Sequence, residues 1–177
     1  MKLSPKFKHH CEAIAVNWRY EFQLQPYDAL PAERIVEKLE GKAVTPDELD
    51  FAPIEARERL MQQSDWSAWL FSLKPLLIIY HPAHTPARRQ SSLMHEIAHV
   101  LLEHPPVPFH PETGMPMRNP IYEDEATYLG SCLQIPRLGL LWATQKGMNI
   151  GEIAAHFGAS EQLVNFRSNM TGIAIPS

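Results

Sequence analysis

The chain has 177 residues, of which 45% are hydrophobic and 20% charged, a composition typical of a globular protein and unlike that of a disordered one. Its net charge of −4 gives no basic surface that would favour nucleic acid or an anionic membrane. The two cysteines, Cys11 and Cys132, are too few for a disulfide framework, and no apolar run has the length of a signal peptide or a membrane span. We therefore expect a cytoplasmic protein.

The spacing of apolar residues predicts an α+β fold that is mostly helical, with a small antiparallel sheet. In chain order the pattern indicates a helix over 6–22, a helix over 32–40, a short strand over 43–45, a helix over 53–61, strands over 66–73 and 75–80, and helices over 87–103 and 121–133. The Lys74-Pro75 step between the two longer strands favours a hairpin or a tight bend.

The C-terminal residues 149–164 resemble a helix-turn-helix, with a short helix, a turn that contains glycine, and Ser160 as the N-cap of a second helix. Contact with DNA would need cations on that second helix, yet only Arg167 is present there, beside Glu161. We therefore interpret the segment as a packing or protein-docking element and expect no direct binding of nucleic acid. The predicted boundary divides the chain into residues 1–146 and 147–177.

The motif His95-Glu96-Ile97-Ala98-His99 carries the clearest chemistry in the sequence. On a helix, residues four apart lie one above the other, so both imidazoles can reach the same metal ion. Glu96 lies beside them, where its carboxylate can take a proton from water at the metal. The motif thus predicts a zinc hydrolase in which His95 and His99 are ligands and Glu96 is the general base.

A catalytic zinc ion usually has three protein ligands, so a third must come from elsewhere in the chain. In the longer metzincin pattern it is a histidine six residues after the second one, and Pro105 occupies that position here. His104 is one residue short, and we expect it to be solvated. The other possible third ligand is a carboxylate from the helix over 121–133.

Glu123 and Glu125 flank the buried stripe of that helix at about equal angles, so periodicity alone does not choose between them. Thr127 lies one turn after Glu123 and offers a hydroxyl that could steady a ligating imidazole, which favours Glu123. Gly130 and Ser131 on the same helix are small enough to let it pack closely against a neighbouring helix.

The paired segments HEIAHVLLEH and EDEATYLGSCLQIP resemble the corresponding motifs of the ImmA/IrrE metallopeptidases. The resemblance implies a zincin-like, gluzincin-type metallopeptidase domain over 1–146, with the helix-turn-helix-like segment packed on it. It also implies that His95, His99 and Glu123 hold one Zn²⁺ ion, which Mn²⁺ could replace, and that Glu96 is the general base. The Asn or Asp that is usual in the family falls on Thr127 in this chain.

Members of that group cleave helix-turn-helix repressors, so the resemblance implies a site-specific endopeptidase in a stress-response or mobile-element switch. The expected partner is a repressor encoded nearby. The competing hypothesis is a DNA-binding transcriptional regulator whose zinc site is structural or vestigial. A factor from a toxin–antitoxin or phage module is a further alternative.

The sequence also suggests roles for three side chains, for one strand and for one loop. Tyr122, His104 and Arg88 are all candidates for stabilising the oxyanion, and the sequence does not choose among them. The strand over 75–80 could border the cleft and pair with an extended substrate, or it could be ordinary sheet core. The proline-rich loop over 104–121 could be a rim that exposes Phe109 and Met115 to a partner, or a passive linker.

Overall fold

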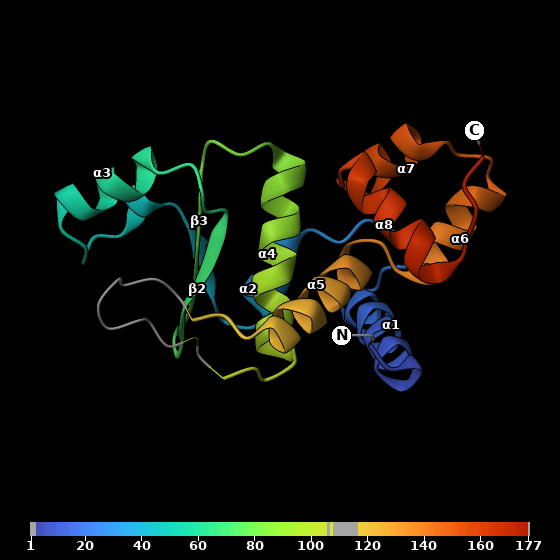
Figure 1. The fold of residues 1–177 in the computed structure, drawn as a ribbon, viewed down its shortest axis with the longest axis horizontal. Helices are drawn as coiled ribbons and strands as arrows, with labels where there is room; N and C mark the ends of the chain where they lie inside the picture. The colour runs from blue at the N-terminus through green and yellow to red at the C-terminus, as the bar shows by residue number, and fades with distance from the viewer. Residues whose placement is uncertain (1–2, 106, 108–116, 177) are drawn as a thin grey trace.

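The computed structural model describes residues 3–105, 107 and 117–176 (Figure 1). The described residues form an α+β fold, which confirms the predicted class. Its elements in chain order are α1 (Pro5–Glu21), α2 (Ala32–Lys38), β1 (Lys42–Val44), the 3-10 turn η1 (Pro46–Glu48), α3 (Ile54–Gln62), β2 (Ala68–Leu73), β3 (Leu76–Tyr80), α4 (Pro86–Leu101), α5 (Pro120–Gln134), α6 (Arg137–Gln145), α7 (Ile150–Phe157) and α8 (Glu161–Thr171). All of these except η1 and α6 were expected from the sequence, with ends that differ by one or two residues in most cases.

Figure 1 shows α4 running beside the sheet, with α5 crossing it and α1 lying beyond α5. Helices α6, α7 and α8 gather at the opposite end of the molecule from α3. Within the described part of the chain, no helix has both the length and the apolar character that crossing a membrane requires.

The described residues include a sheet of three strands in the order β1-β3-β2. Strand β2 is antiparallel to β3, and Lys74 and Pro75 form the turn between them, as predicted. Strand β1 is parallel to β3, so the expectation of an antiparallel sheet was wrong: the sheet is mixed. The three residues of β1 are too few to carry a pattern from which its partner could be deduced.

The order of the strands also decides between the two hypotheses for the strand over 75–80. This segment is β3, which pairs on both edges and has Ile78 and Ile79 fully buried. It therefore has no free edge for a substrate and belongs to the sheet core. Among the described residues, β2 pairs only with β3, so the free edge on the side of α4 belongs to β2.

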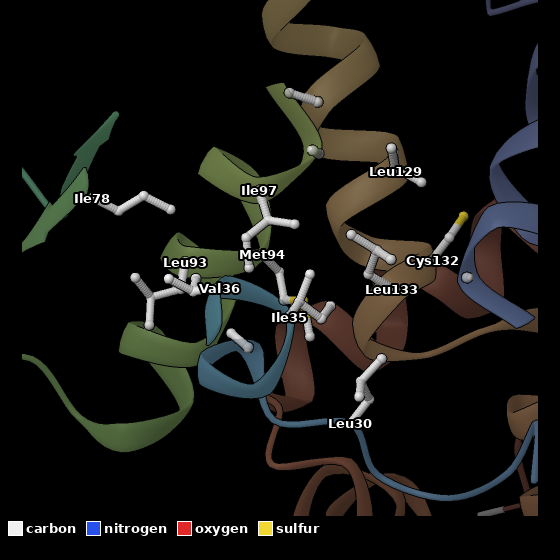
Figure 2. Packing of buried hydrophobic residues seen from close by; sticks show 14 of the residues in the cluster. Leu30, Ile35, Val36, Ile78, Leu93, Met94, Ile97, Leu129, Cys132 and Leu133 are labelled. Carbon is white, nitrogen blue, oxygen red and sulfur yellow. The ribbon is translucent and has the colours of Figure 1, made fainter. Parts of the chain in front are cut away.

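The main core lies between α4, α5, α2 and the sheet. Figure 2 shows Leu93, Met94 and Ile97 of α4 and Leu129 and Leu133 of α5 within one cluster of buried hydrophobic residues. All five side chains are fully buried. A buried aliphatic side chain contributes roughly 1.5–3 kcal/mol, so this contact holds the two helices firmly together.

Gly130 of α5 lies at a close contact between the backbones of α4 and α5. A Cβ atom at this position would lie 3.0 Å from the carbonyl oxygen of Met94 and 3.1 Å from the amide nitrogen of His95. Since both neighbours are backbone atoms, they have little room to move. The structure thus confirms that this small residue allows the close packing expected from the sequence.

The Gly130→Ala substitution should lower the free energy of unfolding by about 1–3 kcal/mol, because the added methyl group overpacks the contact between the helices. Gly151→Ala on α7 is the matched control, since the nearest atoms to its Cβ would lie at 3.5 Å. The control should be neutral or slightly stabilising, as alanine is favoured over glycine in helices. Urea titration of both variants measures the difference, and equal stabilities would contradict this account of Gly130.

Helices α6, α7 and α8 have a core cluster of their own that includes Leu140, Ile153, Phe157 and Val164. The left-handed Gly158 ends α7 at φ 59°, and the hydroxyl of Ser160 caps α8 by accepting from the amide of Leu163. The two helices and the cap are as expected. The likeness to a helix-turn-helix and the boundary at residue 146 remain predictions.

Arg167, the cation that DNA contact by α8 would require, is fully buried. Its guanidinium donates to the backbone carbonyl of Ile135 at 2.8 Å and forms a short ion pair with Glu12 of α1. The other carboxylate oxygen of Glu12 accepts from the backbone amide of Arg137 at 2.7 Å. Glu12 thus joins α1 to both α6 and α8, and Arg167 is not available to a phosphate.

Candidate metal centre

Helices α4 and α5 each begin at a capped end that fixes the position of the site. The hydroxyl of Thr85 accepts from the amide of Arg88 at the start of α4, and the side chain of Asn119 accepts from the amide of Ile121 at the start of α5. Both helices have proline near the first position, where its missing N–H costs nothing. Glu123, in the first turn of α5, lies against His95 and His99 in the C-terminal half of α4.

The structure brings His95, His99 and Glu123 together, so that one donor atom from each lies within 4.8 Å of the others. The two Nε2 atoms are 3.2 Å apart. The carboxylate oxygens of Glu123 lie 3.2 Å from Nε2 of His95 and 3.6 Å from Nε2 of His99.

These separations can be compared with those that a metal ion would impose. A tetrahedral zinc ion about 2.1 Å from each ligand atom places the ligand atoms about 3.4 Å from one another. The observed range of 3.2 to 3.6 Å lies on either side of that value. Two imidazoles and one carboxylate are also a common donor set for catalytic zinc. In both geometry and chemistry, the three residues fit a divalent cation.

The protonation states of these groups also suit a metal ligand set. Glu123 has its pKa lowered to about 2, first by its hydrogen bond with His95 and then by the positive charge of Arg118. Burial, followed by the neighbouring His95, lowers the pKa of His99 to about 4. At neutral pH the metal-free protein therefore presents an ionised carboxylate and a neutral imidazole, which are the forms that bind metals.

Two further residues contact the cluster. The hydroxyl of Thr127 lies 3.5 Å from Nδ1 of His95, which confirms the expected contact between this side chain and an imidazole of the motif. The guanidinium of Arg118 donates to Glu123 at 3.0 Å. Arg118 was not among the predicted site residues, although its position just before the first turn of α5 places it close to Glu123 in the sequence.

Glu96 lies on the face of α4 that is turned toward β2. Its side chain is largely buried, and one carboxylate oxygen accepts from the backbone amide of Leu70 at 3.1 Å. Burial raises the pKa of Glu96 above its usual value, although the charges of His95 and Arg118 oppose the shift. A carboxylate with a raised pKa is better suited to exchange protons near neutral pH.

Two cavities meet at Glu96, Trp69 and Arg118, which line both of them. The larger cavity, of about 780 Å³, lies on the side of His95 and has many polar lining residues, including Gln63, Asp65, Ser67, Arg88, Ser91 and Ser92. The smaller cavity, of about 350 Å³, lies on the side of His99. Its lining combines the polar groups of the candidate centre with a larger share of apolar residues, which include Leu70, Phe71, Leu73, Pro105 and Val107. The two sides of the candidate centre therefore differ in polarity.

Of the three candidates for oxyanion stabilisation, Arg88 lies apart from His104 and Tyr122, which lie together. Arg88 reaches the wall of the larger cavity, where its guanidinium donates to the hydroxyl of Ser67 at 2.9 and 3.2 Å. The expectation that His104 is solvated was wrong, because it is buried with its Nδ1 atom 2.9 Å from Nδ1 of His99. The ring of Tyr122 stacks on that of His104, with the ring centres 4.5 Å apart. The role itself remains a prediction for all three.

Glu125, the other carboxylate that flanks the buried stripe of α5, lies apart from the cluster. Its side chain contacts Nε2 of His104 at 3.1 Å. Phe109 and Met115 of the proline-rich loop lie outside the described residues.

The chain was also compared with known proteins. A search of curated proteins finds no match. The family model of peptidase family M78, described as the IrrE N-terminal-like domain, matches residues 52–169, which are 118 of the 177 residues. The match contains α4 and α5 with the candidate centre between them. The chain therefore belongs to this metallopeptidase family.

Proposed function

We propose that this protein is a zinc-dependent endopeptidase that cleaves a regulatory protein, with a helix-turn-helix repressor encoded nearby as the substrate. One observation carries the proposal: the donor atoms of His95, His99 and Glu123 have the spacing of a tetrahedral metal site, directly beside the buried Glu96. Family membership supports the peptidase activity. The identity of the repressor rests on the resemblance to the ImmA/IrrE group.

In this mechanism a Zn²⁺ ion held by His95, His99 and Glu123 would polarise the scissile carbonyl and make an attacking water more acidic. Glu96 accepts the proton of that water and then donates it to the leaving amine. The amide of Leu70 holds one of its carboxylate oxygens, which leaves the other for proton transfer. Mn²⁺ could take the place of zinc in the same donor set.

The substrate would lie in extended form along the free edge of β2, between the two cavities. An added strand gains affinity from main-chain hydrogen bonds, and its side chains alternate between the two sides. The larger, more polar cavity and the smaller, more apolar cavity would then receive side chains on either side of the scissile bond.

The proposal is tested by incubating the purified, zinc-loaded protein with the repressor encoded by the adjacent gene, with and without a chelator. The expected result is cleavage into a few discrete fragments, lost with the chelator and restored by zinc. An unfolded protein such as casein is the control and should resist cleavage. An intact repressor, together with salt-sensitive binding of DNA by the purified protein, would instead favour the transcriptional regulator.

Metal binding should also stabilise the fold. Zinc at 100 times its dissociation constant adds about 2.7 kcal/mol, which raises Tm by about 5–10 °C in a domain of this size. The shift should disappear in Glu123→Gln. Glu37→Gln, an exposed position on α2, is the control and should keep it. A zinc-induced shift that survives in Glu123→Gln would exclude this carboxylate from the ligand set.

A further inference from the structure

A line of three side chains extends from the candidate centre into the protein. Nδ1 of His99 lies 2.9 Å from Nδ1 of His104, and Nε2 of His104 lies 3.1 Å from a carboxylate oxygen of Glu125. His99 and His104 are both buried, with side-chain exposures of 8% and 6%. Tyr122 stacks on the ring of His104 with an angle of 24° between the planes. Each ring nitrogen of His99 and His104 thus has a specific partner.

The direction of each hydrogen bond follows from the chemistry of imidazole. A neutral imidazole carries hydrogen on one nitrogen and a lone pair on the other. If Nε2 of His99 binds a metal through its lone pair, its hydrogen is on Nδ1, and Nδ1 of His104 must accept it. The hydrogen of His104 is then on Nε2, which donates to Glu125. Metal binding at one end therefore fixes the tautomer of both histidines.

We propose that His104 and Glu125 are positioning residues that hold His99 in the orientation and tautomer that bind the metal. The proposal rests on the role of His99 as a ligand in the proposed function. A ligating histidine commonly donates its second N–H to a carboxylate or a backbone carbonyl, and loss of such a partner weakens metal binding by about 10–100-fold. In this chain a second histidine stands between the ligand and the carboxylate.

The other ligating histidine is held less firmly. Nδ1 of His95 has Thr127 at 3.5 Å, and its side chain is 21% exposed. The shorter and more deeply buried contact of His99 with His104 makes His99 the better-ordered imidazole of the pair. The affinity of the site should therefore depend strongly on His104.

The geometry also argues against a role for His104 as a ligand. Its nearest contact to the cluster is with Nδ1 of His99, the ring atom turned away from Glu123, and its own Nε2 is directed at Glu125. Among the described residues, His95, His99 and Glu123 form the one cluster of donor groups that could hold a metal ion, and His104 is not part of it. His104 therefore acts through His99.

The test compares two substitutions of His104, one that keeps an aromatic ring and one that keeps a hydrogen-bond acceptor. His104→Phe keeps an aromatic ring to stack on Tyr122 but removes both nitrogen atoms. His104→Asn gives up the ring but keeps an oxygen near the position of Nδ1, which can accept from His99. His10→Phe, at an exposed position on α1, is the matched control.

Zinc affinity is measured by competition with a chromophoric chelator, and the visible spectrum of the cobalt-loaded protein reports the ligand geometry. We expect zinc to bind His104→Phe about 10–100-fold more weakly, with an altered cobalt spectrum. We expect His104→Asn to restore most of the affinity and His10→Phe to match the unmodified protein. Glu125→Ala leaves His104 in place and should weaken binding less than His104→Phe does.

The proposal is overturned if His104→Phe binds zinc as tightly as the unmodified protein with the same cobalt spectrum, or if His104→Asn binds as weakly as His104→Phe. Failure of the unmodified protein to bind zinc would also overturn it. Should His104→Phe fail to fold, as judged by circular dichroism, Glu125→Ala decides, and unchanged affinity there would reject the proposal. Because no substrate is used, these results are separate from the cleavage test of the proposed function.

Discussion

Glu96→Gln should reduce the rate of cleavage by about 10²–10⁴-fold while zinc remains bound, because the amide cannot accept the proton of the attacking water. The carbonyl oxygen of glutamine can still accept from the amide of Leu70, so the side chain should keep its place. Single-turnover cleavage of the repressor and the zinc content after dialysis measure the two effects. Glu103→Gln, at an exposed position just after α4, is the control and should cleave normally.

The same substitution should raise the thermal stability of the metal-free protein. Burial raises the pKa of Glu96 in the folded state, so the unfolded state releases the proton at a lower pH. As pH rises from the unfolded value of about 4.3 through the raised folded value, the carboxylate progressively loses its favourable protonated form and stability falls. The neutral amide avoids this loss. At neutral pH we therefore expect a higher Tm for Glu96→Gln, with the difference disappearing below about pH 4.

Undiminished cleavage by Glu96→Gln would exclude Glu96 as the general base. Loss of zinc from this variant would instead mean that the carboxylate supports the ligand set directly. A lower Tm at neutral pH would contradict the effect of burial on its charge.

Glu12→Gln should cause the largest loss of stability, about 3–5 kcal/mol, because it leaves the charge of the buried Arg167 without a partner. One guanidinium nitrogen of Arg167 already has no hydrogen-bond partner among the described residues. The loss corresponds to a fall in Tm of about 6–20 °C. Zinc affinity should stay unchanged, since Glu12 is not part of the donor cluster.

Glu21→Gln on the same helix is the matched control. Glu21 pairs with Lys38 at 3.8 Å, and both side chains are more than half exposed. Exposed pairs of this kind contribute less than about 1 kcal/mol. Thermal unfolding of the two variants gives the comparison, and equal Tm values would show that burial of the Glu12–Arg167 pair has little effect.

The sequence predicted the parts of the site that depend on the periodicity of a helix. Four-residue spacing placed His95 and His99 on one face of a helix, and the structure brings both to one point. The choice of Glu123 over Glu125 needed a second side chain, Thr127, because helical periodicity treats the two carboxylates alike.

The parts that sequence analysis missed depend on how distant segments pack. His104 follows the end of α4, and its burial depends on the stacking of Tyr122 from the next helix. The pairing of β1 with β3 joins strands that are separated in the sequence by η1, α3 and β2. The three residues of β1 are too few to predict this partner. Arg167 appeared to be a surface cation because its partner, Glu12, lies 155 positions away.

The family match begins at residue 52, yet the segment before it builds part of the interior. Ile35 and Val36 of α2 are buried against the helix that carries the histidines, and β1 supplies one strand of the sheet. Both nitrogen and oxygen of the Gln90 amide on α4 bind the backbone at Leu30 and Ala32. A recombinant fragment trimmed to the limits of the match would therefore lack α2, β1 and the backbone partners of Gln90. One side of the helix that carries the histidines would then be exposed to water.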